Sequence, residues 1–355
     1  MNTRRWRNWL KRSLLLCVTF ALVTACQGSI VQNSVQNLPL SNVSAASNGS
    51  STACRIVRHD MGETKLCGQP QRVAALSPHI LDSMLSLGVQ PAAYAEVATL
   101  SLEKFDNPSA QIPYLGDRVT TQPVNLGKRE NPSLEKLMLV QPDLILGETW
   151  TSQDQYQLLN RIAPTLLFSD IKGNKQVWTH DIQLIAKALD REQEAKQLLA
   201  NHAQQVAEAR SQLKPIVDAY PNVLVLAVNT LMNDVAIAAD STAGRLLEEM
   251  GFHLVFPKSV QAGEARWLQT SLEILPTLDA DIVVVIAWDL SNLYHPEEQL
   301  KAKWNKTPLL QTIPAAKAGR LFFVDYQLWG SVTRGPITDE LILKKLSELP
   351  LKIVP

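Results

Sequence analysis

The sequence predicts an α/β protein with two lobes, each a mainly parallel sheet covered by helices, joined by one long helix. Three observations predict this class. Short apolar strands alternate with helices over residues 72–168 and again after 215, which is typical of parallel sheets covered on both faces. Residues 174–214 contain no strand candidate, and residues 191–214 are rich in Ala, Gln, Glu and Leu. About 300 residues follow the polar N-terminal stretch, which is long for one core and favours two domains.

The N-terminus predicts export from the cytoplasm. Residues 1–25 contain five basic residues followed by a ten-residue apolar run, Leu14–Val23. A basic region, a short apolar region and small residues at a cleavage site form a secretory signal, and this run is too short to span a membrane. The run Val23-Thr24-Ala25-Cys26 is similar to a bacterial lipobox. We therefore expect Cys26 to be lipidated and to become the new N-terminus, with ordinary cleavage as the alternative.

Residues 26–53 predict a flexible linker to that anchor. They are rich in Ser, Asn, Gln and Ala and carry no charge, a composition that does not support a packed core. Removal of residues 1–25 leaves a formal charge of −5 and no basic stripe, which excludes a nucleic-acid partner. We expect an extracytoplasmic protein, periplasmic or at the cell surface, anchored to the membrane by lipid.

The N-terminal lobe is assigned to residues 54–173 and begins with a predicted hairpin. Two alternating segments flank a turn at Asp60–Glu63, and the hairpin lies between Cys54 and Cys67. Because disulfides persist outside the cytoplasm, we expect these two thiols to form a structural disulfide. A metal site is the alternative, and two thiols without a nearby Cys/His pair make a poor one.

Strands and helices alternate through the rest of this lobe. Continuous apolar runs predict buried strands, and capping residues, Gly and Pro mark the helix ends. The predicted strands are 72–76, 92–95, 144–146 and 165–168, and the predicted helices are 80–87, 134–140 and 156–162. Ser133 is the expected N-cap of the 134–140 helix, with Glu135 in the first turn, where the helix dipole favours a carboxylate.

Residues 174–214 are assigned to a helical connector and residues 215–355 to the C-terminal lobe. The connector is expected to contain helices 177–189 and 191–214, the second ended by Pro215 and roughly 36 Å long. The C-terminal lobe is expected to contain strands 223–228, 281–286 and 321–324, a helix from Ser241 to Met250, a Ser271-capped helix 272–275 and a helix 338–346.

One pattern occurs in both lobes. Residues 133–135 read Ser-Leu-Glu and precede a strand led by Asp143, and residues 271–273 repeat Ser-Leu-Glu before a strand led by Asp281. Both features are offset by 138 residues. The equal offset favours pseudo-repeated lobes over two unrelated capped helices.

Five segments together resemble a known family. They are Pro70–Pro78, Asn125–Leu137, Ile162–Thr165, Asp240–Leu247 and Pro314–Arg320. In this order, over about 54–350, they resemble the periplasmic binding proteins for ferric siderophores, haem and cobalamin. The resemblance implies a ligand cleft between the lobes and delivery of the ligand to the permease and ATPase of an ABC importer. Glu135 and Glu273 match the family's glutamates that pair with permease arginines; serving helix dipoles is the alternative, and both roles are compatible.

The candidate ligand-binding residues favour an iron(III)-siderophore. Such a chelate already wraps its iron, so the protein needs cations for its oxygens and flat aromatic faces. By resemblance, Arg129 matches the family's key arginine through its Gly-x-Arg-x-x-Pro spacing, and Trp267 matches a cleft tryptophan. Trp150 follows a strand end, where open α/β sheets bind ligands. The other candidates lie beside these residues or on further strand-end and cleft segments: Ser77, His79, Arg266, Tyr326, Trp329 and Arg334. A place in the core is the alternative for each.

Other functions are weighed against this one. Cobalamin or haem is the alternative ligand, and Tyr326, Tyr94 or His79 could serve as a haem axial ligand. A direct metal receptor is disfavoured because no two of the six histidines share helical or alternate-strand spacing. An extracytoplasmic enzyme is disfavoured because there is no Gly-x-Ser-x-Gly elbow and no phosphate loop. We expect no enzymatic activity, no cofactor, no direct metal ligand, a monomer, and small lobe closure.

Overall fold

The computed structural model describes residues 54–97, 101–169, 177–258, 267–289 and 296–348. The expected signal peptide (1–25), Cys26, the linker (26–53) and Arg266 lie outside the described residues. No helix in the described ranges combines the length and the apolar character needed to cross a membrane.

The N-terminal lobe contains a five-stranded parallel sheet with strand order β5-β4-β3-β6-β7. Its strands are β3 (Val73–Ala75), β4 (Ala93–Glu96), β5 (Val124–Lys128), β6 (Leu144–Glu148) and β7 (Thr165–Phe168). All residues of β3, β4, β6 and β7 are buried, as expected for apolar runs covered on both faces. The edge strand β5 was not predicted, because its sequence, Val-Asn-Leu-Gly-Lys, has no continuous apolar run.

The helices of this lobe are α1 (Pro78–Ser86), α2 (Pro108–Gln111), α3 (Leu134–Val140), α4 (Thr149–Ser152), α5 (Tyr156–Ile162) and α6 (Val177–Leu189), with short 3-10 turns η1 (Gly116–Arg118) and η2 (Gln153–Gln155). The three helices predicted in this lobe are present as α1, α3 and α5, whereas α2 and α4 were not predicted. Helix α6, which the sequence assigned to the connector, packs into the core of this lobe. The Ser133 side chain accepts a hydrogen bond from Lys136 N at 3.2 Å, which confirms the predicted N-cap of α3. Helices α5 and α6 have the predicted bounds.

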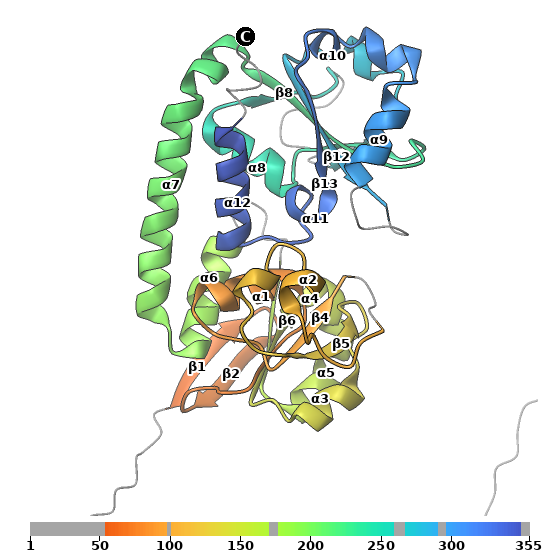
Figure 1. Cartoon of the computed structure of the whole chain (residues 1–355). Helices are drawn as coiled ribbons and strands as arrows, with labels where there is room; N and C mark the ends of the chain where they lie inside the picture. The colour runs from red at the N-terminus through yellow and green to blue at the C-terminus, as the bar shows by residue number, and fades with distance from the viewer. Residues whose placement is uncertain (1–53, 98–100, 170–176, 259–266, 290–295, 349–355) are drawn as a thin grey trace, which may run out of the picture. The chain divides into compact units, whose positions relative to one another are not determined.

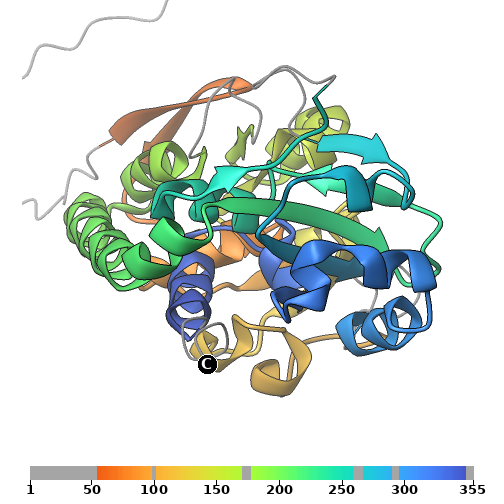
Figure 2. The same cartoon turned by 90° about the horizontal axis from the view of Figure 1, so that it is seen from above.

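The predicted hairpin and its disulfide are confirmed. Strands β1 (Cys54–His59) and β2 (Gly62–Cys67) pair antiparallel, and Cys54 is bonded to Cys67. The Arg55 guanidinium donates to the carbonyls of Lys187 and Ala188 at 2.5 and 2.6 Å. These carbonyls belong to the last turn of α6, where a cation is favourable, so the hairpin is held beside α6 (Figure 2).

The C-terminal lobe contains a mixed sheet with strand order β11-β9-β8-β12-β13, and β10 pairs with β8. Its strands are β8 (Asn222–Asn229), β9 (Val235–Ala238), β10 (His253–Leu254), β11 (Trp267–Thr270), β12 (Ile282–Trp288) and β13 (Leu321–Asp325). Strands β8, β10, β12 and β13 are parallel, whereas β9 pairs antiparallel with β8 and β11. The two antiparallel strands were not predicted.

The helices of this lobe agree with the sequence in part. They are α8 (Thr242–Met250), α9 (Pro296–Trp304), α10 (Pro314–Lys317), α11 (Tyr326–Trp329) and α12 (Pro336–Ser347), with 3-10 turns η3 (Leu275–Thr277) and η4 (Pro308–Thr312). The predicted helix 272–275 is wrong, because residues 272–274 form a turn that leads into η3. Pro276 explains the difference, since it has no N–H to bond the carbonyl of Leu272.

Helix α7 (Glu192–Ala219) packs against both lobes (Figure 1). Ala195 near its start belongs to the N-terminal core, and Leu213 and Ile216 near its end belong to the C-terminal core. The predicted end at Pro215 is wrong, because the helix continues to Ala219. A proline inside a helix costs about 3 kcal/mol, and burial of Ile216, at roughly 1.5–3 kcal/mol, offsets much of this cost.

Helix α12 is tied to elements of both lobes by a buried carboxylate. Asp339 accepts a hydrogen bond from the Trp178 indole N–H of α6 at 2.9 Å and pairs with Arg245 of α8 at 2.5 Å. His202 of α7 lies 3.7 Å from the same carboxylate, and its ring packs edge-on against Trp178. Three helices therefore meet α12 at a single side chain.

The predicted pseudo-repeat is visible in the two sheets. Strands β6 and β12 hold the same place, fourth in the order of their sheets. The Asp143 carboxylate accepts hydrogen bonds from the backbone N–H groups of Gln71 and Arg72, just before β3. The Asp281 carboxylate accepts from the N–H of Asn222, the first residue of β8. Each carboxylate therefore satisfies backbone donors where the neighbouring strand begins.

Candidate functional site

A buried carboxylate joins the two lobes at the carboxyl end of β6. Glu148, the last residue of β6, is fully buried. Its Oε1 accepts hydrogen bonds from the indole N–H of Trp150, at 3.1 Å, and from Nη2 of Arg334. Trp150 belongs to α4 directly after β6, whereas Arg334 lies between α11 and α12 of the C-terminal lobe. The carboxylate therefore connects a strand end of one lobe with a loop of the other.

A second arginine reaches this group from the loop after β5. The Arg129 guanidinium lies 4.6 Å from the ring centre of Trp150, a cation–π distance. Its Nε donates to Glu130 at 3.0 Å, and its side chain is only 11% exposed. Its Nη1 is buried and has no hydrogen-bond partner among the described residues. Arg129 therefore keeps an unused donor beside the ring of Trp150, a residue that is 46% exposed.

The charges of this group influence one another. Burial, together with the nearby charge of Arg129, lowers the pKa of Arg334 to about 9. Burial raises the pKa of Tyr326, and the charge of Arg129 opposes that rise. Tyr326 begins α11, so Arg129 acts on groups of the C-terminal lobe as well as on its own. Two guanidiniums with little solvent around them repel each other, and an added anion would stabilise both.

Buried polar groups support the Arg129 loop from inside the N-terminal lobe. Glu96, the last residue of β4, accepts hydrogen bonds from the Tyr94 hydroxyl at 2.8 Å and from Val97 N at 2.6 Å. The backbone carbonyl of Glu96 accepts from Arg129 N at 2.8 Å. Burial raises the pKa of Glu96. The Tyr94 hydroxyl is thus buried and engaged with Glu96, which removes Tyr94 as a haem-ligand candidate.

A second contact between the lobes fixes the chain directly after Arg334. Helix α12 begins after Gly335 and receives no capping hydrogen bond from that residue. Asp82 of α1 supplies the cap instead, since its carboxylate accepts from Ile337 N at 3.0 Å, Thr338 N at 2.9 Å and Thr338 Oγ1 at 2.6 Å. A Cβ atom on Gly335 would lie 2.4 Å from Asp82 Cγ, so only glycine permits this approach.

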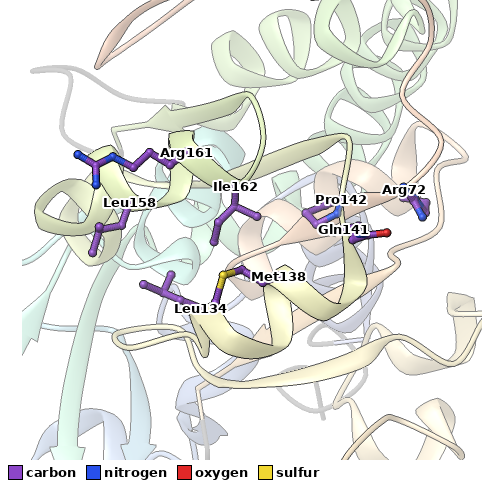
Figure 3. A pocket seen from close by; sticks show the side chains of 8 residues that line it. All are labelled: Arg72, Leu134, Met138, Gln141, Pro142, Leu158, Arg161 and Ile162. Atoms are coloured by element: carbon purple, nitrogen blue, oxygen red, sulfur yellow. The ribbon is translucent and has the colours of Figure 1, made fainter.

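Helix α3 carries an exposed surface separate from this group. Glu135 is exposed in its first turn, and Met138 and Leu139, three and four residues later, are 57% and 79% exposed. A pocket of about 770 Å³ lies between α3 and α5 (Figure 3). Its lining residues are Arg72, Leu134, Met138, Gln141, Pro142, Leu158, Arg161 and Ile162. An acidic group and an apolar patch therefore share one helix, which is typical of a protein-binding surface.

Glu273 is also exposed, although it does not lie on the predicted helix. It belongs to the turn before η3, and a hydrogen bond from the Ser271 side chain lowers its pKa. Glu273 is therefore a surface carboxylate that stays charged.

A family model described as periplasmic binding protein matches residues 73–328. The chain belongs to this family. The Fe(3+)-citrate-binding protein YfmC of Bacillus subtilis is 27% identical over 276 residues, 78% of this chain and 79% of its own length. A second Bacillus subtilis protein, YhfQ, named as an ABC transporter substrate-binding lipoprotein, is 27% identical over 305 residues, 83% of this chain and 88% of its own. The solved structure of Staphylococcus aureus SirA with staphyloferrin B is 25% identical, with a TM-score of 0.65, and the match covers 84% of this chain and 98% of SirA.

Several residues expected to bind the ligand lie inside this periplasmic binding protein. Ser77 is fully buried and caps α1 by accepting from Ile80 N at 3.3 Å. His79 is buried, and its Nδ1 lies 2.5 Å from the carbonyl of Arg334; because a carbonyl only accepts, Nδ1 carries the proton. Trp329 is 5% exposed and belongs to the C-terminal core. His79 therefore positions Arg334, and Ser77 and Trp329 serve the fold.

The remaining candidates differ in their surroundings. Arg129, Trp150 and Arg334 belong to the group around Glu148, and Tyr326 lies within the influence of Arg129. Trp267 is 42% exposed on β11, the edge strand of the mixed sheet, and takes no part in those contacts. Glu96 and Glu148 were not among the predicted site residues. Each is a carboxylate at the carboxyl end of an apolar strand, and that position is the signal that could have identified them.

Proposed function

We propose that this protein is the extracytoplasmic substrate-binding component of an ABC importer and captures an anionic, oxygen-rich iron(III)-siderophore between its lobes. The observation that carries the proposal is the Arg129 guanidinium, held on the face of Trp150 with a buried, unpartnered Nη1. Membership of the periplasmic binding proteins supports a binding role. The ferric citrate of YfmC and the staphyloferrin B of SirA, named for those relatives, support this class of ligand.

The chemistry of the group fits the oxygen atoms of such a chelate. A guanidinium can donate two parallel hydrogen bonds to a carboxylate, and its charge strengthens each of them. Trp150 offers an exposed aromatic face for packing against the chelate. Arg334 brings a second cation from the opposite lobe, and Tyr326 adds a phenol. We include Trp267 and its neighbour Arg266 as further contacts from the C-terminal lobe.

The proposal includes a membrane partner. Glu135 and Glu273, one from each lobe, would pair with arginines on the extracytoplasmic side of the permease, whose ATPase drives import. Exposed ion pairs contribute little individually, so their role is orientation and steering. Met138 and Leu139 would add apolar contact beside Glu135. Residues 1–25 would direct export, Cys26 would carry the lipid, and residues 26–53 would act as a tether for a monomer.

A titration of tryptophan fluorescence tests the ligand. The full-length protein in detergent is titrated with ferric citrate, with ferric hydroxamate and catecholate chelates, and with haem and cobalamin. We expect saturable quenching by a ferric chelate, because Trp150 lies in the group. Arg129→Ala should weaken that binding about tenfold or more, since a hydrogen bond from a charged group contributes about 1.5–3 kcal/mol.

Arg58→Ala provides the matched control. Arg58 is an exposed arginine on the hairpin that pairs with Glu63, and its loss should leave binding unchanged. A response only to haem or cobalamin would retain the transport role and overturn the ligand. Silence across the panel, or equal losses in both arginine variants, would overturn the proposed site.

A further inference from the structure

Glu148 stands out among the residues of the site because its charge is of the wrong sign for an anion-binding group. Its carboxylate is completely buried, and Oε1 accepts hydrogen bonds from Trp150 and Arg334. Its Oε2 is buried and has no hydrogen-bond partner among the described residues. A buried carboxylate oxygen without a partner is costly, so the position of Glu148 is not explained by stability alone.

The contact between Glu148 and Arg334 is of the kind that a ligand carboxylate makes with a guanidinium. Arg334 contacts Oε1 through Nη2, and its Nη1 donates to the carbonyl of Ser331 at 3.0 Å. His79 holds the backbone of Arg334 through its carbonyl. The guanidinium therefore stays in position whether its anionic partner is Glu148 or a ligand.

The two arginines of the site, Arg129 and Arg334, give a reason for a carboxylate in the same buried group. Arg129 and Arg334 are close enough for the charge of Arg129 to lower the pKa of Arg334. Without a negative charge between the lobes, the two guanidiniums would repel each other. Glu148 supplies that charge from within the protein.

We propose that Glu148 is a placeholder for the ligand's anionic group: the chelate displaces it from Arg334 on binding, and Glu148 returns to Arg334 on release. The inference rests on the proposed function and adds how the same site exchanges its ligand. A placeholder weakens binding, because the ligand must compete with a tethered carboxylate. It also assists delivery, because the arginine is never left unpaired as the ligand departs.

The alternative role for Glu148 is a structural tie between the lobes. The two roles predict opposite results for Glu148→Gln. Glutamine keeps the shape and one acceptor oxygen for Trp150 and Arg334 but removes the charge. A placeholder that loses its charge competes less, so anionic ligands should bind more tightly. If Glu148 is a structural tie, the Glu148→Gln variant should bind every ligand as well as wild type does, or less well.

The test compares wild type, Glu148→Gln and the surface control Glu63→Gln in full-length protein. Tryptophan fluorescence is titrated with ferric citrate, an anionic chelate, and with ferrioxamine B, whose free ammonium group makes it cationic. We expect Glu148→Gln to bind ferric citrate about tenfold more tightly or better, because one competing charge is removed in a shielded site. Binding of ferrioxamine B should not improve. Glu63, half-exposed in its pair with Arg58, should change neither affinity.

Each outcome decides the inference. Unchanged or weaker ferric citrate binding in Glu148→Gln overturns it, and so does equal tightening for both probes. If wild type binds neither probe, binding of ferric citrate by Glu148→Gln alone supports the placeholder, and continued silence overturns it. The proposed function fails separately, when wild type binds no chelate of the larger panel. Thermal unfolding of the three proteins confirms that the variants are folded.

Discussion

Loss of the Asp82 carboxylate should remove a contact between the two lobes and lower the free energy of unfolding. Asp82 of α1 accepts hydrogen bonds from Ile337 N, Thr338 N and Thr338 Oγ1 at the start of α12, and all of these groups are buried. Asp82→Ala leaves two backbone donors without partners, at about 1–3 kcal/mol each. We therefore expect the free energy of unfolding to fall by about 3–4 kcal/mol. Asp82→Asn keeps one acceptor oxygen and should cost about half as much.

Urea unfolding followed by tryptophan fluorescence measures this loss. Gly335→Ala should be similarly destabilising, because its Cβ would lie 2.4 Å from Asp82 Cγ. The exposed residue Asp154 provides a control, and Asp154→Ala should stay within about 0.5 kcal/mol of wild type. If Asp82→Ala loses less than about 1 kcal/mol, the carboxylate does not cap α12 in solution and the reasoning is refuted.

Three further predictions concern separate parts of the molecule. Glu135→Arg and Met138→Asp should reduce uptake of radioactive iron in cells while chelate affinity in vitro stays unchanged; a matching loss of affinity would contradict a docking role. Replacing Cys54 and Cys67 by serine should lower the free energy of unfolding by about 2–3 kcal/mol, because the bond closes a short loop. A reductant should lower the free energy of unfolding of wild type by the same amount. If neither the serine variant nor the reductant lowers it, the prediction is refuted. Burial lowers the pKa of His202 from its ordinary 6.5. As the pH falls, the imidazole is therefore protonated in the unfolded chain before it is protonated in the folded protein, and the free energy of unfolding decreases between pH 6.5 and the lowered pKa. Urea midpoints between about pH 7.5 and about pH 5 should therefore decline less in His202→Gln, and parallel declines would contradict this.

Local signals in the sequence predicted the elements they control. The N-cap at Ser133 and the bounds of α5 and α6 follow from residues within one or two turns of each helix. The end of α7 could not be predicted in this way, because the burial that continues the helix past Pro215 depends on the C-terminal core. The antiparallel strands β9 and β11 could not be predicted from local signals, because they form by pairing with β8 and with each other, and the sequence does not show which segments pair.

The candidate site shows the same division between local and distant information. The sequence identified Arg129 by its resemblance to the family's arginine and Trp150 by its place after a strand, and the structure brings the two residues into contact. It could not show that Glu148 and Arg334, 186 residues apart, form a pair. Nor could it show that Trp329 points into the core, because a position next to a loop does not fix the direction of a side chain.

The cap on α12 has a consequence for how the chain acquires its structure during synthesis and export. Asp82 and its two backbone donors are separated by 255 and 256 positions. The contact between α1 and α12 therefore cannot form until almost the whole chain has been made. Contacts between such distant segments form slowly, because a long intervening loop must close first. Until α12 is synthesised and exported, α1 presents a carboxylate and the apolar surface around it without their partner. The first lobe is therefore most exposed to proteases and to association with other chains during export. This exposure ends when α12 packs against α1.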